Sequence, residues 1–175
     1  MPTWLFDFAD PQAAQAWQAI DDRVMGGQSR SRLRHDPQGH AVFEGEVSLD
    51  RNGGFASVRS TPGKRGLAGA QVCLVELRGG PTPFKLCLLT DDGFDSLQYQ
   101  AVFAPAAADW HSLCLPLAAF SARFRGRQVP GAAPLDPARI RQVGLMTVSR
   151  QAGPFALAIR RICLARPHSE AFSPR

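Results

Sequence analysis

The stretch that organises this chain lies near its start and reads Asp21-Asp22-Arg23-Val24-Met25-Gly26-Gly27-Gln28-Ser29. A second stretch of the same kind follows as Asn52-Gly53-Gly54-Phe55-Ala56-Ser57-Val58-Arg59-Ser60. A glycine pair beside strand-like residues marks a place where the backbone turns sharply or approaches another group closely. A turn or bulge between strands is the simpler interpretation, and a binding loop is the alternative. We expect the two pairs to meet in space, with Asp21 or Asp22 paired to Arg23 or Arg59.

The composition is that of an ordinary globular protein. Its 175 residues are 45% hydrophobic and 20% charged, which suits a single domain that buries a full core. No apolar run reaches the ~18 residues of a membrane span, and the first residues lack the basic start of a signal peptide. We therefore expect a cytoplasmic protein, with one domain over residues 1–166 and a flexible tail over residues 167–175.

Short alternating segments separated by turn residues predict an all-β fold. The strand candidates are residues 4–8, 29–35, 40–49, 55–60, 71–78, 83–90, 97–104, 110–117, 140–149 and 155–165. Residues 13–20 suggest a turn or two of helix. So many short strands with almost no helix predict a closed antiparallel sandwich. Within it, we expect Trp110 to be a core anchor.

The residues that could bind a metal ion are scattered. The four cysteines, Cys73, Cys87, Cys114 and Cys163, lie in separate apolar runs, and no Cys-x-x-Cys or Cys/His cluster appears. The stretch Asp91-Asp92-Gly93-Phe94-Asp95 lacks the ligand spacing and distal glutamate of an EF-hand, so a hairpin turn is the better interpretation. We expect no metal, no cofactor, and four reduced and mostly buried thiols.

The net charge of +5 is carried almost wholly by arginine. Two stripes of alternate arginines occur: Arg30, Arg32 and Arg34 along a predicted strand, and Arg123, Arg125 and Arg127 at the start of an irregular segment. Such stripes could meet phosphates, but proteins that bind nucleic acid usually interleave exposed aromatic residues, and Phe124 is the only candidate nearby. A solvated sheet face is therefore favoured for both stripes, and no nucleic-acid partner is expected.

Several segments together resemble the complex I intermediate-associated protein 30 family. The resemblance rests on the two glycine stretches and on Phe124-Arg125-Gly126-Arg127, Gly144-Leu145 and Gly153-Pro154-Phe155-Ala156-Leu157, and it covers about residues 4–165. It implies a galactose-binding-like jelly-roll β-sandwich, a fold that sugar-binding modules share. The mitochondrial member of that family is an assembly factor for respiratory complex I, so the resemblance also implies a protein-interaction role by analogy.

Two functions follow from these observations. The resemblance, with no complete catalytic arrangement, favours a non-enzymatic interaction or assembly module whose partner is a protein, such as a respiratory-complex subunit or assembly intermediate. Adjacent Asp21 and Asp22 point to opposite faces of an extended chain, so they do not form a catalytic pair. The alternative is a binding module for carbohydrate or another small polar ligand. The candidate binding residues are Trp17, Asp21, Asp22, Arg23, Met25, Gly26, Gly27, Ser29, Gly53, Gly54, Phe55, Arg59 and Arg125.

One structural observation separates the two functions. An exposed tryptophan beside arginine and aspartate in a cleft would favour the small ligand. A flat apolar patch rimmed with arginine would favour a protein partner.

Overall fold

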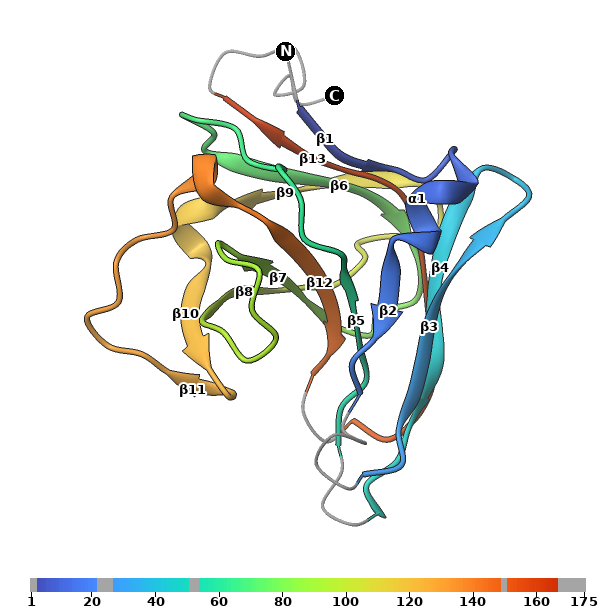
Figure 1. Ribbon diagram of the computed structural model, residues 1–175. Coiled ribbons are helices and arrows are strands. Elements are labelled where there is room, and N and C mark those ends of the chain that lie inside the picture. The colour runs from blue at the N-terminus through green and yellow to red at the C-terminus, as the bar shows by residue number, and fades with distance from the viewer. Residues whose placement is uncertain (1–2, 22–26, 51–53, 149–150, 167–175) are drawn as a thin grey trace.

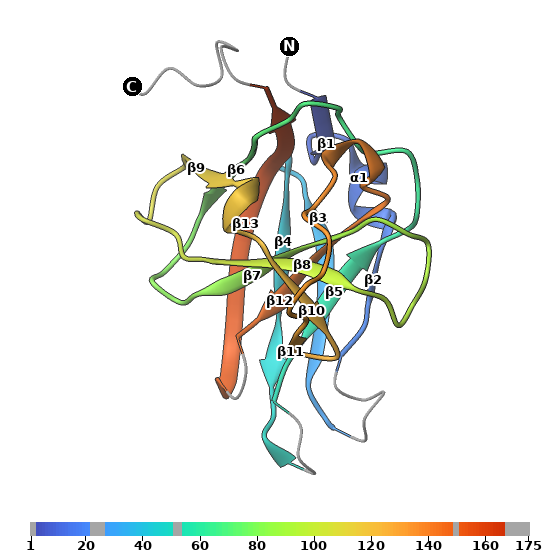
Figure 2. The ribbon, with the colours of Figure 1, turned by 90° about the vertical axis from the view of Figure 1, so that its left-hand side faces the viewer.

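Two antiparallel β-sheets pack face to face in the computed structural model of the protein, which describes residues 3–21, 27–50, 54–148 and 151–166 (Figure 1). The first sheet has the strand order β3-β4-β13-β6-β9, with β1 paired to β13. The second has the order β11-β10-β8-β7-β12-β5-β2, and its strands face the viewer in Figure 2. The predicted all-β sandwich is confirmed.

The strands of the first sheet are β1 (Thr3–Asp7), β3 (Arg30–Asp36), β4 (His40–Val47), β6 (Val72–Arg78), β9 (His111–Pro116) and β13 (Gly153–Ala165). Those of the second sheet are β2 (Trp17–Ala19), β5 (Ser57–Ser60), β7 (Phe84–Leu89), β8 (Gln98–Phe103), β10 (Ser121–Phe124), β11 (Arg127–Gln128) and β12 (Gln142–Thr147). The described helical elements are α1 (Pro11–Gln15) and two 3-10 turns, Leu117–Ala119 and Pro137–Arg139. No helix within these described residues is long and apolar enough to cross a membrane.

The helix lies earlier in the chain than the sequence predicted. Asp10 caps it, since its carboxylate accepts a hydrogen bond from the Gln12 amide at 2.9 Å, and Pro11 stands at the first helical position. The expected helix over residues 13–20 is wrong in its second half, where β2 forms instead. Pairing with β5 gives β2 the backbone hydrogen bonds that a single helical turn cannot supply.

The core lies between the two sheets and is built from alternate residues of the strands. Phe43 on β4, Phe84 on β7 and Leu157 on β13 are almost fully buried there. Trp17 also belongs to this core, because its ring is 8% exposed and its centroid lies 4.9 Å from that of Phe6. Trp17 is among the candidate binding residues, but it lies in the core and does not line the pocket described below.

Trp110, expected to anchor the core, lies on the solvent-facing side of the first sheet. The Arg160 guanidinium lies 4.0 Å from a Trp110 ring centroid, that of Arg78 lies 4.9 Å away, and His40 packs at the ring edge. The prediction fails because Trp110 directly precedes an edge strand and covers arginine side chains instead of apolar ones.

Three of the four thiols follow the prediction of burial. All four cysteines are free, and Cys73, Cys87 and Cys163 are buried, whereas Cys114 is exposed. Burial raises the pKa of Cys87 to about 12 and that of Cys163 to about 11. Cys114 differs because β9 is an edge strand whose outward residues meet solvent.

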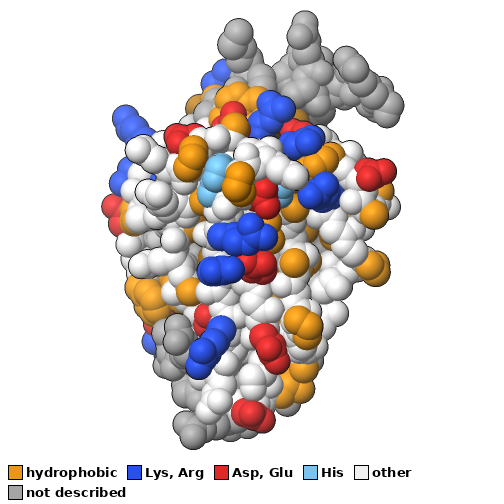
Figure 3. Space-filling view, turned by 90° about the vertical axis from the view of Figure 1, so that its right-hand side faces the viewer, with side chains coloured by type: hydrophobic (Ala, Val, Ile, Leu, Met, Phe, Trp, Pro, Cys, Tyr) orange, Lys and Arg blue, Asp and Glu red, His pale blue; other side chains and the backbone are white. Residues whose placement is uncertain are grey.

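The outer face, meaning the solvent-facing side of the first sheet, is covered by paired charges. Glu44 accepts hydrogen bonds from Arg34 Nε at 2.6 Å and Arg32 Nη2 at 2.9 Å, because Arg32 lies directly opposite it in the β3–β4 pair and Arg34 is its diagonal neighbour. Glu76 also pairs with two arginines, Arg160 and Arg161, which are consecutive residues at a register shift of β13. Figure 3 shows basic and acidic side chains interspersed on this side of the molecule.

Candidate functional site

A pocket of about 690 Å³ opens on the solvent-facing side of the second sheet. Five strands, β5, β7, β8, β10 and β12, supply most of its walls. In β7, for example, Lys85 and Cys87 line the pocket, whereas Leu86 between them is fully buried. Side chains two apart on a strand share a face, so Lys85 and Cys87 both face the pocket.

The floor is hollow because small residues lie at its centre. Arg59, Gly144, Cys87 and Gln100 stand in register across four neighbouring strands, so two small residues lie between two long ones. A Cβ on Gly144 would lie 3.4 Å from the Cys87 Cβ, and any longer side chain would enter the pocket. Glycine at this position therefore keeps the depression open.

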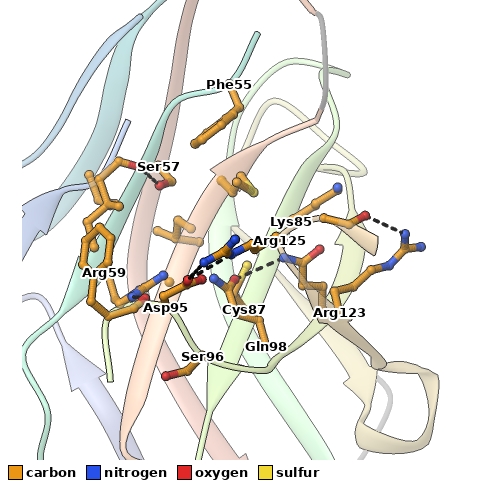
Figure 4. A pocket seen from close by; sticks show the side chains of 18 residues that line it. Phe55, Ser57, Arg59, Lys85, Cys87, Asp95, Ser96, Gln98, Arg123 and Arg125 are labelled. Carbon is orange, nitrogen blue, oxygen red and sulfur yellow. Dashed lines mark hydrogen bonds and ion pairs between the residues drawn. The ribbon is translucent and has the colours of Figure 1, made fainter. Parts of the chain in front are cut away.

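Two segments that connect strands form the rim of the pocket. The loop between β7 and β8 brings Phe94, Asp95 and Ser96 to the pocket, and the turn between β10 and β11 brings Arg125 (Figure 4). Arg125 Nε and Nη2 donate to the same Asp95 oxygen at 2.9 and 2.5 Å, which joins the two connections across the opening. The hydrogen bond from Arg125 lowers the pKa of Asp95, so this carboxyl is ionised at neutral pH.

Arg125 is held there by an unusual backbone conformation. Phe124 pairs with Arg127, so Arg125 and Gly126 form a two-residue hairpin turn with φ of 51° and 78°. Two consecutive positive φ angles are those of a type I′ turn, which residues other than glycine, asparagine and aspartate rarely begin. The turn directs the Arg125 side chain toward Asp95 at the cost of backbone strain.

Arg59 lies deepest among the pocket cations. It is 9% exposed, donates from Nη1 to the Phe94 carbonyl at 2.8 Å, and lies 5.7 Å from the Phe94 ring centroid. Burial lowers its pKa, although Asp91 and Asp95 oppose this from a distance. Arg59 is therefore a charged group that is largely shielded from water. A backbone carbonyl lies within hydrogen-bonding distance of it, but no described carboxylate does.

Polar side chains without charged partners complete the wall. Gln100 donates to Gln98 at 3.1 Å, and Arg123 Nη1 donates to the Gly126 carbonyl at 3.4 Å. In the described part of the chain, Lys85 and Arg123 form no ion pair. Figure 4 shows Lys85 and Arg123 on the opposite side of the pocket from Arg59.

The structure brings together only some of the residues chosen from the sequence. Phe55, Arg59 and Arg125 line the pocket. Gly27 and Gly54 are buried, and Ser29 is buried and exchanges hydrogen bonds with the Ser48 backbone. The remaining candidates, Asp22, Arg23, Met25, Gly26 and Gly53, lie outside the described residues.

Asp21 joins the two glycine stretches but not in the predicted way. Its buried carboxylate accepts hydrogen bonds from the Ser31 amide at 3.0 Å, the Ser31 hydroxyl at 2.5 Å and the Ser57 amide at 2.9 Å. Ser31 belongs to the first sheet and Ser57 to the second, so Asp21 ties the layers together where the two stretches meet. Of the expected pairs, that of Asp21 with Arg59 does not form, because the Arg59 guanidinium donates to the Phe94 carbonyl instead. The other expected pairs involve Asp22 or Arg23, which lie outside the described residues.

Sequence reasoning missed Lys85, Gln98, Gln100 and Arg123 as pocket residues. Their signal is the polar residue at alternate positions in strands that are otherwise apolar, such as Lys85 within Phe84–Leu89. Arg123 belonged to a stripe that was interpreted as a solvated face. Within the described residues, no group of three or more His, Cys, Asp and Glu side chains is placed to hold a metal ion.

Together these features define a class of protein, an antiparallel β-sandwich of galactose-binding-like type with a polar pocket on one sheet. The sequence profile of Complex I intermediate-associated protein 30 (CIA30) matches residues 6–159, and the chain belongs to this family. A search of curated protein sequences gave no match.

The solved structures with a similar fold include carbohydrate-binding modules and an agarase. One is the family 11 carbohydrate-binding module from Clostridium thermocellum in complex with a β-1,3-1,4-mixed-linked tetrasaccharide, with TM-score 0.70, 14% identity and coverage of 94% of this chain and 95% of that one. Another is the family 11 module of a cellulosomal cellulase of Clostridium thermocellum, with TM-score 0.68, 15% identity and coverage of 97% and 98%. An exo-β-agarase matches with TM-score 0.57 and 13% identity over 97% of this chain and 26% of its own. At these identities the likeness is one of fold.

Proposed function

We propose that the protein is a non-catalytic, cytoplasmic binding module whose pocket on the second sheet binds a carbohydrate or another small polar ligand. The observation that carries this proposal is the convergence of hydrogen-bonding side chains from β5, β7, β8 and β10 on one hollow floor. A concave site with a few fixed polar groups is the usual form of a small-ligand site.

The chemistry of the lining supports a polyhydroxyl ligand. Gln98 and Gln100 carry both donors and acceptors, and Asp95 keeps one oxygen that Arg125 does not use. Phe94, 59% exposed at the rim, offers an aromatic surface. The combination of aspartate, arginine and an exposed aromatic residue in a cleft is the arrangement expected for a small ligand, with phenylalanine in place of tryptophan. The tetrasaccharide bound by a module of the same fold supports the same ligand class.

The test fills the floor of the pocket. Gly144→Val places two methyl groups beyond the Cβ position and should abolish ligand binding. Calorimetric titration would use the mixed-linked tetrasaccharide, glucose, galactose, glucuronate, galacturonate and glucose 6-phosphate as probes. Gly80→Val is the matched control, because a Cβ there meets nothing within 4 Å. Phe94→Ala keeps the floor intact and should weaken binding by ~1–2 kcal/mol if the ring stacks on the ligand. Failure of every probe to bind the wild-type protein would contradict the proposal.

Family membership favours a second function, that of an assembly module for respiratory complex I. Its surface would include the edge where Asp21 joins the two glycine stretches, next to the Arg59 side of the pocket. Affinity capture from the native cells should then recover complex I subunits or assembly intermediates. Arg59→Ala should reduce this capture more than it lowers the melting temperature, and full capture by that variant would place the partner surface elsewhere.

A further inference from the structure

We infer that the ligand of this pocket carries a negatively charged group, a carboxylate or a phosphate, on a polyhydroxyl framework. This inference rests on the proposed function and adds the charge of the ligand to it. Its basis is an excess of positive charge that the described residues leave uncompensated inside the pocket.

The charges of the pocket do not balance. Four cationic side chains line it, Arg59, Lys85, Arg123 and Arg125, against a single described carboxylate, that of Asp95. Asp95 is already engaged by two hydrogen bonds from Arg125. Three cations therefore face the same cavity without a carboxylate within ion-pairing distance in the described part of the chain.

The cations are built into the walls of the pocket. Arg59 comes from β5, Lys85 from β7 and Arg123 from β10, and the order of the sheet places these strands on both sides of the hollow floor. Arg59 and Gln100 end a row that spans three strand spacings, about 14 Å at the usual separation of paired strands. A charge inside a concave wall of low polarity produces a stronger field than the same charge on an open surface.

A partly buried cation lowers the stability of the folded protein unless an anionic group pairs with it. Arg59 shows the cost, because burial lowers its pKa. The outer face of the protein shows that the chain can balance arginine with glutamate: Arg32 lies directly opposite Glu44 in the β3–β4 register. In the pocket, the residue directly opposite Arg123 is Gln98. An anionic group entering the pocket would supply the missing countercharge and accept charge-assisted hydrogen bonds.

The uncharged residues that line the pocket indicate which kind of molecule would carry the negatively charged group. The glutamine amides and the hydroxyls of Ser57 and Ser96 match hydroxyl groups, and Phe94 matches the apolar face of a ring. A sugar acid or a sugar phosphate combines these features with the negative charge. The two classes share the anion and differ in its geometry: a planar carboxylate suits a bidentate guanidinium, whereas a phosphate suits point contacts from Lys85 as well.

The experiment compares matched pairs of probes on the full-length protein. Glucose is titrated against glucuronate and glucose 6-phosphate, and galactose against galacturonate, at low and at physiological salt. We expect each acidic probe to bind about tenfold or more tightly than its neutral partner, with the difference reduced at higher salt. Tighter binding of the uronates assigns the site to carboxylates, and tighter binding of the phosphate assigns it to phosphates.

Variants locate the effect. The double variant Lys85→Met/Arg123→Met keeps side-chain length, removes two pocket charges, and should erase the preference for acidic probes. Its control, Arg127→Met/Arg139→Met, removes two charges from exposed positions that do not line the pocket and should retain the preference. Melting curves of both double variants check folding, and the single variants Lys85→Met and Arg123→Met serve if the first double variant unfolds.

The outcomes separate this inference from the proposed function. Equal binding of neutral and acidic probes by the wild-type protein overturns the inference while the binding function stands. An acidic preference that survives Lys85→Met/Arg123→Met also overturns it, since the charge would then be recognised elsewhere. Absence of binding by every probe contradicts the proposed function itself.

Discussion

The outer face of the first sheet and the pocket face of the second are both rich in arginine. They differ in the groups that lie next to these arginines. On the outer face, Arg32 and Arg34 share Glu44, and Arg160 and Arg161 share Glu76. On the pocket face, the hydrogen bonds of Arg59 and Arg123 within the described part of the chain go to backbone carbonyls, those of Phe94 and Gly126. The difference indicates that charge on the first sheet contributes to stability, whereas charge on the second is available to a ligand.

The comparison also shows why a stripe of arginines in a sequence has no fixed meaning. The stripes on β3 and at β10–β11 have the same alternating pattern. In the first, Arg32 and Arg34 pair with Glu44 of the neighbouring strand. In the second, Arg123 stands opposite Gln98 of its neighbouring strand, and Arg125 pairs with Asp95 of a loop. Whether an arginine of such a stripe is neutralised therefore depends on the side chains that neighbouring strands and loops bring to it, which the stripe itself does not specify.

The largest expected effect comes from giving the pocket the countercharge that the outer face already has. Gln98→Glu places a carboxylate directly opposite Arg123, where it can still accept the hydrogen bond from Gln100. We expect affinity for an acidic sugar to fall by about 30- to 100-fold, equivalent to ~2–3 kcal/mol. Calorimetric titration of glucuronate into wild type and variant measures the change. Undiminished affinity would show that Arg123 and Gln98 lie outside the ligand contact.

A smaller effect is expected from removing a countercharge on the outer face. Burial of Glu44 opposes its ionisation, but hydrogen bonds from Arg34 and Arg32 outweigh this and lower its pKa. Glu44→Gln should therefore reduce the free energy of unfolding by about 1 kcal/mol, or lower the melting temperature by ~2–4 °C. Glu46→Gln is the control, because the exposed Glu46 forms no ion pair within the described residues. Equal effects of the two substitutions would mean that the ion pairs of Glu44 contribute nothing specific.

The smallest expected effect is a loss of stability when His40 on the outer face becomes protonated. Burial lowers the pKa of His40 below its ordinary 6.5, and nearby Arg78, Arg160 and Arg34 add to this, while Asp36 at 3.8 Å opposes it. The unfolded chain therefore takes up a proton near pH 6.5 that the folded protein resists. The stability contributed by neutral His40 is complete above that pH and is lost as the pH falls below it.

Denaturant unfolding at pH 7.5 and at about pH 5.5, above the usual range of the carboxyl groups, measures this loss. His40→Phe keeps an aromatic ring beside Trp110 and should flatten the pH dependence between these values. A wild-type protein whose unfolding free energy stays constant over this interval would contradict the expected loss of stability at acidic pH. No comparable histidine lies among the described pocket residues, so the effect belongs to the outer face alone.

Much of the fold followed from local patterns. Alternation over residues 29–35 gave both the strand β3 and its division into an arginine side and a Ser31/Leu33 side, because side-chain period alone sets which residues share a face. The expected meeting of the two glycine pairs stays a prediction, because Gly26 and Gly53 lie outside the described residues. What the structure shows between the two stretches is the hydrogen bond from the Ser57 amide to Asp21. The helix was misplaced because pairing of Trp17–Ala19 with β5 depends on a distant strand.

Much less of the pocket could be predicted from the sequence. Phe55, Arg59 and Arg125 were among the candidates, but the residues between them come from strands whose neighbours the sequence does not specify. Lys85 is a single polar residue in an apolar strand until β12 and β8 are placed on either side of it. Trp110 misled for a related reason, since a large aromatic residue covers arginines as readily as it fills a core.

The turn at Arg125 lowers the stability of the protein but places a cation at the pocket. A left-handed conformation costs a residue with a Cβ about 1 kcal/mol or more, and asparagine or glycine would adopt it more cheaply. Selection for heat resistance alone would therefore replace Arg125, and with it would go the cation that joins Asp95 across the pocket opening. Persistence of an arginine at this turn under such selection would mark the turn as part of the binding function, and its loss would mark a protein that no longer needs its ligand.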